Sequence, residues 1–554
     1  MPRRFFSLQE ALEKVTESED FEEIVELPPA TVDLISDEEE VCEDGRPNDV
    51  PGEIEILSEG ETVSEPASKR KKRNMKWCPE SDATFVRFES FSPNQNLERI
   101  LTELGDVDEL SIFCDFIMKE IFELMSTQSN IYAGQKNKAF TSTSSDCKVF
   151  VGILLLSGYR KQPRQEMFWS SDGDVGCDLV KDAMTKNRFL DLKASLHLND
   201  NSCIPENCQD KMYKIRPLLE KMNSNFQQFG VFEENVSIDE KIVQYFGRNA
   251  LKQFIRGKPI RFGFKQWALC FSRSGYCYKF DIYQGATSEK CDLPLGARVV
   301  KDLLTDVPKG ICVYFDNFFS SFSLFDLLVS AGFKFVCTMR LNRIPPNPFS
   351  CDKEMKKMQR GGYEAKFESN AKVLIVRWHD NSIVNVASNC IGVTPLDFSV
   401  RRSKKQTVRV TTPHVIKQYN AHMGGVDHDD WFVEKYRINI HGKKWYWPLI
   451  THSIDVALVN AWILFNLSHG TTLDLLTFRR RVTVGLLNHR ENVTARKRKY
   501  NRSSWSLASS TGHVISRTDN GKQRRCVVCQ KTVRKECSTC NVGLHIECFS
   551  FYHN

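Results

Sequence analysis

The clearest alternation of hydrophobic and polar positions lies in the middle of the chain, from residue 234 onward. An extended run at 235–243 is followed by two aromatic-rich runs, 265–271 and 276–283, and the Ser272-Arg-Ser-Gly275 turn between them predicts a β-hairpin. Residues 311–315 form a continuous apolar run, which is typical of a strand buried on both faces. The remaining spacing predicts helices over 297–304 and 322–329 and a strand over 334–339.

Three antiparallel strands followed by alternating helices and strands are the element order of a ribonuclease-H-like α/β core. In that order the first and fourth strands are neighbours, so Asp239 and Asp316 are expected to meet at their ends. Asp427 opens a predicted helix after Gly424 and Gly425 and would deliver a third carboxylate. Phosphodiester chemistry with two divalent metals needs such oxygens converging from different elements. The alternative for each aspartate alone is a turn or cap residue.

The segments on either side of this core have helical spacing. Apolar residues recur every three or four positions in 114–125 and 149–156 before the core and in 454–465 after it, which predicts packed helices. Residues 340–412 instead alternate short β-like runs with turns. This region is interpreted as an inserted β-rich domain, which separates Asp316 from Asp427 in the sequence.

Length and composition limit the class of protein. A chain of 554 residues is too long for a single core. We find neither a secretory signal nor an apolar run of about 18 residues, so we expect a soluble intracellular protein with no membrane partner. Without a secretory signal, the 19 cysteines argue against a disulfide framework.

The net charge of +6 hides two opposite regions. Residues 1–66 hold 21 acidic and 4 basic side chains, so the remainder carries a net charge of about +23. The acidic arm is expected to be disordered, and either acts as a solubilising tail or competes with DNA for the basic body. The basic blocks Lys69-Arg-Lys-Lys-Arg73 and Arg496-Lys-Arg-Lys499 are candidates for nuclear import, phosphate contact or a plain solvated charge run.

Two further segments combine features that suit nucleic acid. In Lys443-Lys444-Trp445-Tyr-Trp447 aromatic rings lie among cations, an arrangement that suits unpaired bases and phosphates. The alternative is that both tryptophans belong to the core. A second basic run is a weaker phosphate candidate, since the alternative is that alternate members of a strand face water; it consists of Arg256, Lys258, Arg261 and Lys265.

The carboxy-terminal region has the spacing of zinc ligands. It reads Cys526-x2-Cys529-x7-Cys537-x2-Cys540-x4-His545-x2-Cys548-x4-His553. So short a segment lacks a sufficient apolar core, so zinc would supply much of its folding free energy, on the order of 10 kcal/mol. We expect a cross-brace with two structural Zn²⁺ ions: Cys526, Cys529, His545 and Cys548 at one site, and Cys537, Cys540 and His553 at the other. The second site is then one ligand short.

Five motifs in order give the chain a family resemblance: SIDE with FGR (237–240 and 246–248), RGKPIRFGFK (256–265), YFDNFFSS (314–321), YNAHMGGVDHDD (419–430) and the terminal Cys/His module. Over residues 80–554 the set resembles the piggyBac family of DNA transposases and their domesticated relatives. The resemblance implies that Asp239, Asp316 and Asp427 hold two Mg²⁺ ions, with Asp430 as an additional acidic residue. It also implies that Trp445 contacts the DNA end.

The reaction implied by the resemblance is cut-and-paste transposition in the nucleus. Water attacks at the transposon 3′ end, the freed 3′-OH forms a hairpin on the opposite strand, the hairpin is reopened, and the 3′-OH joins target DNA at TTAA. The implied partners are double-stranded DNA with terminal inverted repeats, a second copy of the chain in a homodimer, and the nuclear import machinery. The main rival is a noncatalytic DNA-binding or chromatin protein that keeps the scaffold, and a third possibility is a zinc-module adaptor.

Motifs, composition and resemblance together divide the chain into segments. These are an acidic arm that ends in a basic block (1–75), a helical dimerisation and DNA-binding domain in two parts (80–232 and 436–495), a catalytic core in two parts (233–339 and 413–435), the β-rich insertion (340–412), a basic linker (496–520) and the zinc-binding module (521–554).

Overall fold

The computed structural model describes most of the chain between residues 75 and 553. The described residues are 21–27, 53–58, 75–254, 260–285, 293–344, 346–403, 406–489, 513–518 and 522–553. They form two compact units, residues 1–489 and 490–554, which are treated separately below. Both basic blocks proposed for nuclear import lie outside the described residues.

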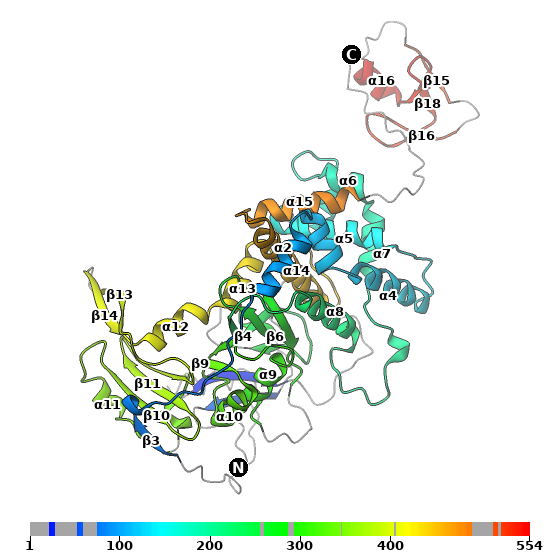
Figure 1. The fold of residues 1–554 in the computed structure, drawn as a ribbon. Coiled ribbons are helices and arrows are strands. Elements are labelled where there is room, and N and C mark those ends of the chain that lie inside the picture. The colour runs from blue at the N-terminus through cyan, green and yellow to red at the C-terminus, as the bar shows by residue number, and fades with distance from the viewer. Residues whose placement is uncertain are drawn as a thin grey trace. The chain divides into compact units, whose positions relative to one another are not determined.

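The centre of the larger unit is a mixed β-sheet (Figure 1). Its middle strand, β4 (Asn235–Gln244), pairs antiparallel with β6 (Phe262–Phe271) on one side and parallel with β8 (Cys312–Phe315) on the other. Strand β7 (Cys277–Ile282) continues the hairpin from β6, and β9 (Lys334–Thr338) pairs parallel with β8. The predicted pairing of the first and fourth strands is therefore confirmed.

Helices connect and cover these strands because their apolar sides need burial. Helix α9 (Leu295–Leu303) precedes β8, and α10 (Phe322–Ala331) joins β8 to β9 and ends at Gly332, whose positive φ of 85° suits glycine. All four residues of β8 are buried, as predicted for a strand covered on both faces. Helices α12 (His414–His422) and α13 (Gly425–Lys435) return the chain to β4.

The helical part contains segments from both sides of the sheet in sequence. Its longest helix, α14 (Trp447–His469), is apolar and long enough to cross a membrane by length and composition, but 89% of its most apolar window is buried. It also carries Asp455, which is paired with Arg479 of α15 inside the fold, so we interpret α14 as a core helix. The longer helices of this part are α2 (Asn94–Leu104), α4 (Ile121–Gln135), α5 (Ser144–Tyr159), α7 (Lys186–Ser195), α8 (Arg216–Gln227), α14 and α15 (Leu475–Asn488).

Most of the inserted region extends the sheet of the core. Strands β10 (Tyr363–Glu368), β11 (Val373–His379) and β12 (Ile383–Ser388) form a meander, and β12 pairs with β9 of the core. Strand β3 (Trp77–Pro79) adds to the far edge by pairing with β10. With β5 (Gln253–Phe254) on β6, ten strands of the described residues share one sheet. Within the inserted region, the hairpin β13–β14 (Asp397–Ser403 and Gln406–Thr412) forms a separate two-stranded sheet.

The acidic arm contains two strands, contrary to the expectation of disorder throughout residues 1–75. Strand β1 (Phe21–Leu27) pairs antiparallel with β2 (Glu53–Ser58). In both segments apolar residues lie between glutamates, a pattern that favours strands. The acidic composition of the whole arm had instead suggested disorder.

The smaller unit is built from short strands and one helix. Strand β15 (Ile515–Arg517) pairs with β18 (Lys535–Cys537), β18 pairs with β19 (Val542–Gly543), and β16 (Arg524–Arg525) pairs with β17 (Thr532–Val533). Helix α16 (Ile546–His553) closes the unit. The unit includes residues 513–518, which the sequence had placed in the basic linker.

Candidate active site and metal-binding module

Two of the predicted catalytic carboxylates lie on neighbouring strands. In the parallel pairing of β4 with β8, Ile238 is opposite Phe315, so Asp239 and Asp316 follow the last paired positions at the same edge. The Asp239 carboxylate accepts the backbone N–H of Glu240, and the Asp316 carboxylate accepts that of Phe318, both at 2.8 Å. These local bonds orient the two side chains at the point where the pairing of β4 with β8 stops.

One face of β4 carries three polar residues and is covered by α13. Side chains alternate along a strand, so Ser237, Asp239 and Lys241 point to the same side. Ser237 Oγ accepts the backbone N–H of Val426 at 3.2 Å, and Lys241 forms an ion pair with Asp429. Ser237 and Lys241, two positions before and two positions after Asp239, both contact α13. Asp239, on the same side of the strand, therefore faces this helix.

Helix α13 carries the remaining predicted carboxylates three residues apart. Asp427 lies in the first turn and is exposed. Asp430 is partly buried, and its Oδ1 atom is buried with no hydrogen-bond partner among the described residues. The spacing of three residues places both on one side of the helix. Among the described residues, the aspartates do not form a group with one oxygen each within 4.8 Å.

The donor set fits a divalent cation. The carboxylates come from a central strand, its parallel neighbour and a helix that covers the same face, and carboxylate oxygens are the ligands that Mg²⁺ prefers. Asp430 Oδ1 is a buried oxygen that accepts no hydrogen bond from the described residues, so it is available to a cation. Asp239, Asp316 and Asp427 would therefore hold the metal, with Asp430 beside them.

Sequence reasoning missed Tyr419, although it begins one of the five motifs. This side chain of α12 hydrogen-bonds to Thr338, and burial, together with the negative charges of Asp316 and Asp239, raises its pKa above the usual range. The charges of Asp316 and Asp239 are smaller causes of this pKa shift than burial. The Tyr419 hydroxyl is thus a neutral hydrogen-bonding group beside the predicted metal ligands.

The structure gives Trp445 and Lys444 core positions. Trp445 is 5% exposed and packs against Phe264, with ring centroids 6.0 Å apart. Lys444 is buried, and its Nζ atom donates to the Leu196 carbonyl at 2.6 Å. A buried indole offers no face to a base, so the predicted contact of Trp445 with DNA is corrected here in favour of the core alternative.

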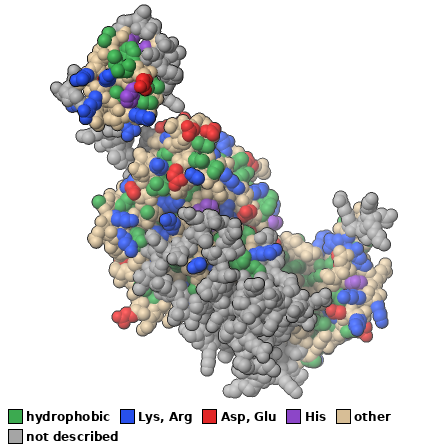
Figure 2. Space-filling view, turned by 180° about the vertical axis from the view of Figure 1, so that it is seen from behind, with side chains coloured by type: hydrophobic (Ala, Val, Ile, Leu, Met, Phe, Trp, Pro, Cys, Tyr) green, Lys and Arg blue, Asp and Glu red, His purple; other side chains and the backbone are tan. Residues whose placement is uncertain are grey.

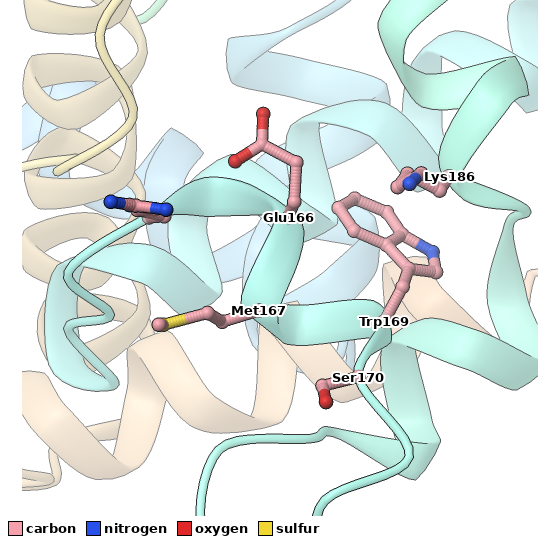
Figure 3. A pocket seen from close by; sticks show the side chains of 6 residues that line it. Glu166, Met167, Trp169, Ser170 and Lys186 are labelled. Atoms are coloured by element: carbon pink, nitrogen blue, oxygen red, sulfur yellow. The ribbon is translucent and has the colours of Figure 1, made fainter.

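Lys443, by contrast, is exposed and lies among other cations of the helical part. Burial and the nearby charge of Lys443 lower the pKa of Lys193 to about 8, although Glu166 opposes this. The same region holds a surface hollow of about 680 Å³. Figure 3 shows Glu166, Met167 and Trp169 projecting from one short turn beside it, and the hollow is lined by Arg164, Glu166, Met167, Trp169, Ser170 and Lys186.

The second predicted basic run is divided by the structure. Lys265 is 5% exposed, and its Nζ atom lies 4.3 Å from the centre of the Trp267 ring and 3.5 Å from Glu240. It therefore stabilises the interior and offers no charge to phosphate, which corrects its assignment as a DNA contact. Arg261 is exposed, whereas Arg256 and Lys258 lie outside the described residues.

An exposed tryptophan lies one helical turn after Asp427. Trp431 is 57% exposed, and Lys435 Nζ lies 3.4 Å from the centre of its ring. The residue belongs to α13, which also carries Asp430. An aromatic ring with a cation beside it is the combination that the sequence had suggested for residues 443–447, found here next to the carboxylates.

The smaller unit gathers eight potential metal ligands into two groups of four. In each group one ligand atom per residue lies within 4.8 Å of the others. One group matches the expected set at the first site. The second adds His513 to the three expected residues, and His513 Nδ1 lies 3.1 Å from Cys540 Sγ and 3.5 Å from Cys537 Sγ. The groups are Cys526, Cys529, His545, Cys548 and His513, Cys537, Cys540, His553.

Both groups could hold Zn²⁺. Four sulfur or nitrogen donors are the set that zinc takes in structural sites. Burial opposes it, but hydrogen bonds from Cys529 and His545 lower the pKa of Cys526 to about 6, and those from Cys540 and His513 do the same for Cys537. The thiolate, the zinc-binding form, is therefore favoured at neutral pH for Cys526 and Cys537, whereas burial and the neighbouring cysteines raise the pKa of Cys548 and Cys540. Both ring nitrogens of His553 are buried without a hydrogen-bond partner among the described residues.

Comparisons with known proteins match most of the chain. A family model described as Transposase IS4 matches residues 108–462. The human PiggyBac transposable element-derived protein 3 is 38% identical over 451 residues, 79% of this chain and 75% of that protein. Human PiggyBac transposable element-derived protein 2 is 34% identical over 461 residues, 81% and 76% of the two chains.

A solved structure supports the fold at lower sequence identity. It is a cryo-EM structure of a piggyBac transposase synaptic complex with hairpin DNA, with a TM-score of 0.60 and 19% identity. The match covers 80% of this chain and 97% of that one. At this identity the likeness establishes the fold.

Proposed function

The chain belongs to the piggyBac transposase family, as its motifs indicated, and we propose that it is a metal-dependent DNA transposase of the DDD type. The observation that supports this most directly is that the four carboxylates belong to three neighbouring elements. Asp239 lies in β4 directly after Ile238, the last residue of that strand paired with β8, Asp316 follows β8, and Asp427 and Asp430 lie on α13, which covers the same face of β4. We classify the core as ribonuclease-H-like on the order β7–β6–β4–β8–β9.

The proposed chemistry is cleavage at the transposon 3′ end, hairpin formation and joining of the 3′-OH at TTAA. Two Mg²⁺ ions bound there would activate the attacking oxygen and stabilise the leaving oxygen. Asp239, Asp316 and Asp427 would bind and orient these ions. We propose that the scissile phosphate lies at this edge of the sheet, where the neutral Tyr419 hydroxyl would donate a hydrogen bond.

DNA binding is proposed for the helical part and for the zinc-binding unit. The described residues of the smaller unit include seven Lys or Arg and two Glu, a net positive charge that suits phosphates. Figure 2 shows several of these cations on one face of the unit. We propose that two structural Zn²⁺ ions fold this unit and that it recognises terminal inverted repeats. Action as a homodimer in the nucleus, through import by the basic blocks, is part of the same proposal.

A domesticated DNA-binding or chromatin protein is the second candidate. The names of the two human relatives describe them as derived from transposable elements. In this chain, however, all four acidic residues of the motifs are present. Intact ligands favour retained chemistry over a scaffold that only binds DNA.

The test is a cleavage assay on the DNA that flanks the coding locus. Inverted repeats ending in TTAA would be sought around the locus and supplied to the purified full chain with Mg²⁺. We expect 3′ nicks at the repeat ends, followed by hairpins and joined products. Specific binding without any nick at saturating Mg²⁺ would favour the domesticated alternative.

Two tryptophans form a matched pair for the DNA-end contact. We expect Trp445→Ala to lower the free energy of unfolding by ~3 to 5 kcal/mol, because it empties a buried site. Trp431→Ala should change stability by less than ~0.5 kcal/mol, since the ring is exposed. If Trp431 stacks on an unpaired base, its loss should cost ~1 to 3 kcal/mol in hairpin formation but not in duplex binding. Thermal melting measures the change in stability, and hairpin yield measures the effect on the DNA end. Unchanged hairpin yield in Trp431→Ala would exclude the stacking role.

A further inference from the structure

A buried ion pair lies directly between the strand and the helix of the proposed active site. Lys241 of β4 and Asp429 of α13 form it, and their side chains are 1% and 0% exposed. Lys241 is two residues after Asp239, and Asp429 lies between Asp427 and Asp430. The pair therefore joins the two elements that supply three of the four carboxylates.

The first turn of α13 is seated against the sheet by close contacts. A Cβ atom at Gly425 would lie 2.6 Å from both the Phe271 carbonyl and Ser237 Oγ, so only glycine allows this approach. A Cβ atom at Gly275, in the β6–β7 turn, would lie 3.0 Å from His428 Cβ. These contacts fix the distance between helix and sheet at one end, but they are nonpolar or involve the backbone.

The ion pair adds a directional contact one turn further along. Asp429 uses Oδ2 for Lys241, while its Oδ1 atom has no hydrogen-bond partner among the described residues. The sulfur atoms of Cys270 and Cys277 line the same space, within 4.8 Å of an Asp429 oxygen. Lys241 is the charged group that compensates the buried Asp429 carboxylate, so the rotation of α13 about its axis is tied to β4.

We propose that the Lys241–Asp429 ion pair positions Asp427 and Asp430 for metal binding. Asp427 and Asp430 move with α13, whereas Asp239 belongs to β4. A small rotation of α13 on β4 therefore changes the distances of both helix carboxylates from Asp239. Lys241 and Asp429 are positioning residues, since neither is itself a proposed metal ligand. The inference rests on the proposed function, because it concerns the same carboxylates.

The test separates positioning from fold stability with two double variants. Lys241→Met/Asp429→Leu replaces the pair by apolar side chains and leaves no buried charge unpaired. The matched control is Arg479→Met/Asp455→Leu, which removes another buried pair, at 2.9 Å and 3% and 0% exposed, between α14 and α15. The single variant Asp429→Asn strands the Lys241 charge and is expected to lower the melting temperature by about 5 °C or more.

Mn²⁺ binding by the full chain, measured from the loss of the free Mn²⁺ electron paramagnetic resonance signal, gives the readout. Asp239→Asn supplies the background from other sites. We expect Lys241→Met/Asp429→Leu to weaken Mn²⁺ binding by roughly 10- to 100-fold, as for other residues that orient metal ligands. The control double variant should bind Mn²⁺ like the wild-type chain, even if its melting temperature falls.

Each remaining outcome refutes a defined claim. If the wild-type chain binds no more Mn²⁺ than Asp239→Asn does, the proposed metal site fails, and this inference fails with it. If the wild-type chain binds and Lys241→Met/Asp429→Leu binds equally well, only the positioning role is wrong. An equal loss in both double variants would assign the effect to general destabilisation and would overturn the inference.

Discussion

Asp239→Asn, Asp316→Asn and Asp427→Asn are each expected to reduce strand cleavage by roughly 10³-fold or more. An amide cannot supply the charge that a carboxylate contributes to a divalent cation, and metal ions contribute several kcal/mol of transition-state stabilisation. Binding of duplex repeat DNA should remain, because these side chains are partly buried or exposed and are not part of the apolar core. Nicking with Mg²⁺ and a filter-binding assay on the same samples measure the two effects.

Asp306→Asn is a suitable control for these variants. Its carboxylate is 64% exposed and lies 3.5 Å from Lys279, a surface pair whose loss costs at most about 1 kcal/mol. This variant should cleave like the wild-type chain. Full cleavage by any one of the three site variants would remove that aspartate from the proposed metal site.

The zinc-binding unit gives the second large effect. Cys529→Ser and His513→Ala should each lower the zinc content from two ions to one or none and unfold the unit, because zinc binding supplies on the order of 10 kcal/mol of its folding free energy. The described apolar core of the unit is small, consisting of Cys526, Val533, Cys537 and Leu544 with partly buried neighbours. Specific binding to repeat ends should fall while the larger unit stays folded.

Zinc analysis and limited proteolysis would check this expectation, with Cys203→Ser as the control. Cys203 is exposed and belongs to the larger unit. A zinc content of two in His513→Ala would show that His513 is not a ligand. Retained zinc in Cys529→Ser would refute the assignment of the first group.

The sequence predicted the core well because each signal there is local. The apolar run before Asp316, the turn at Ser272 to Gly275 and the glycines before Asp427 each specify an element without help from the rest of the fold. Parallel pairing then follows from the order of elements, and it brings Asp239 beside Asp316. Tyr419 and Asp429 could not be assigned this way, because their roles depend on which face of the sheet α12 and α13 cover.

The other differences also arise from tertiary structure. Lys443-Lys444-Trp445 has the same composition whether its rings meet DNA or the core, and only the packing of Trp445 against Phe264 decides between them. His513 precedes the first CxxC pair by 13 positions, outside the usual ligand spacing, and joins the second group because β15 pairs with β18. Alternation identified strands in 340–412, but the pairing of β12 with β9 is a long-range contact.

The pairing of β3 with β10 has a consequence for synthesis on the ribosome. The backbone N–H of Lys76, just before β3, bonds to the Glu368 carboxylate, 292 residues later in the chain. At roughly 5 to 20 residues per second, β3 waits about 15 to 60 s for its partner to be translated. A shortened chain that begins at residue 80 would leave the β10 edge unpaired, and an open strand edge is a template for aggregation. Expression of this protein should therefore start upstream of Met75.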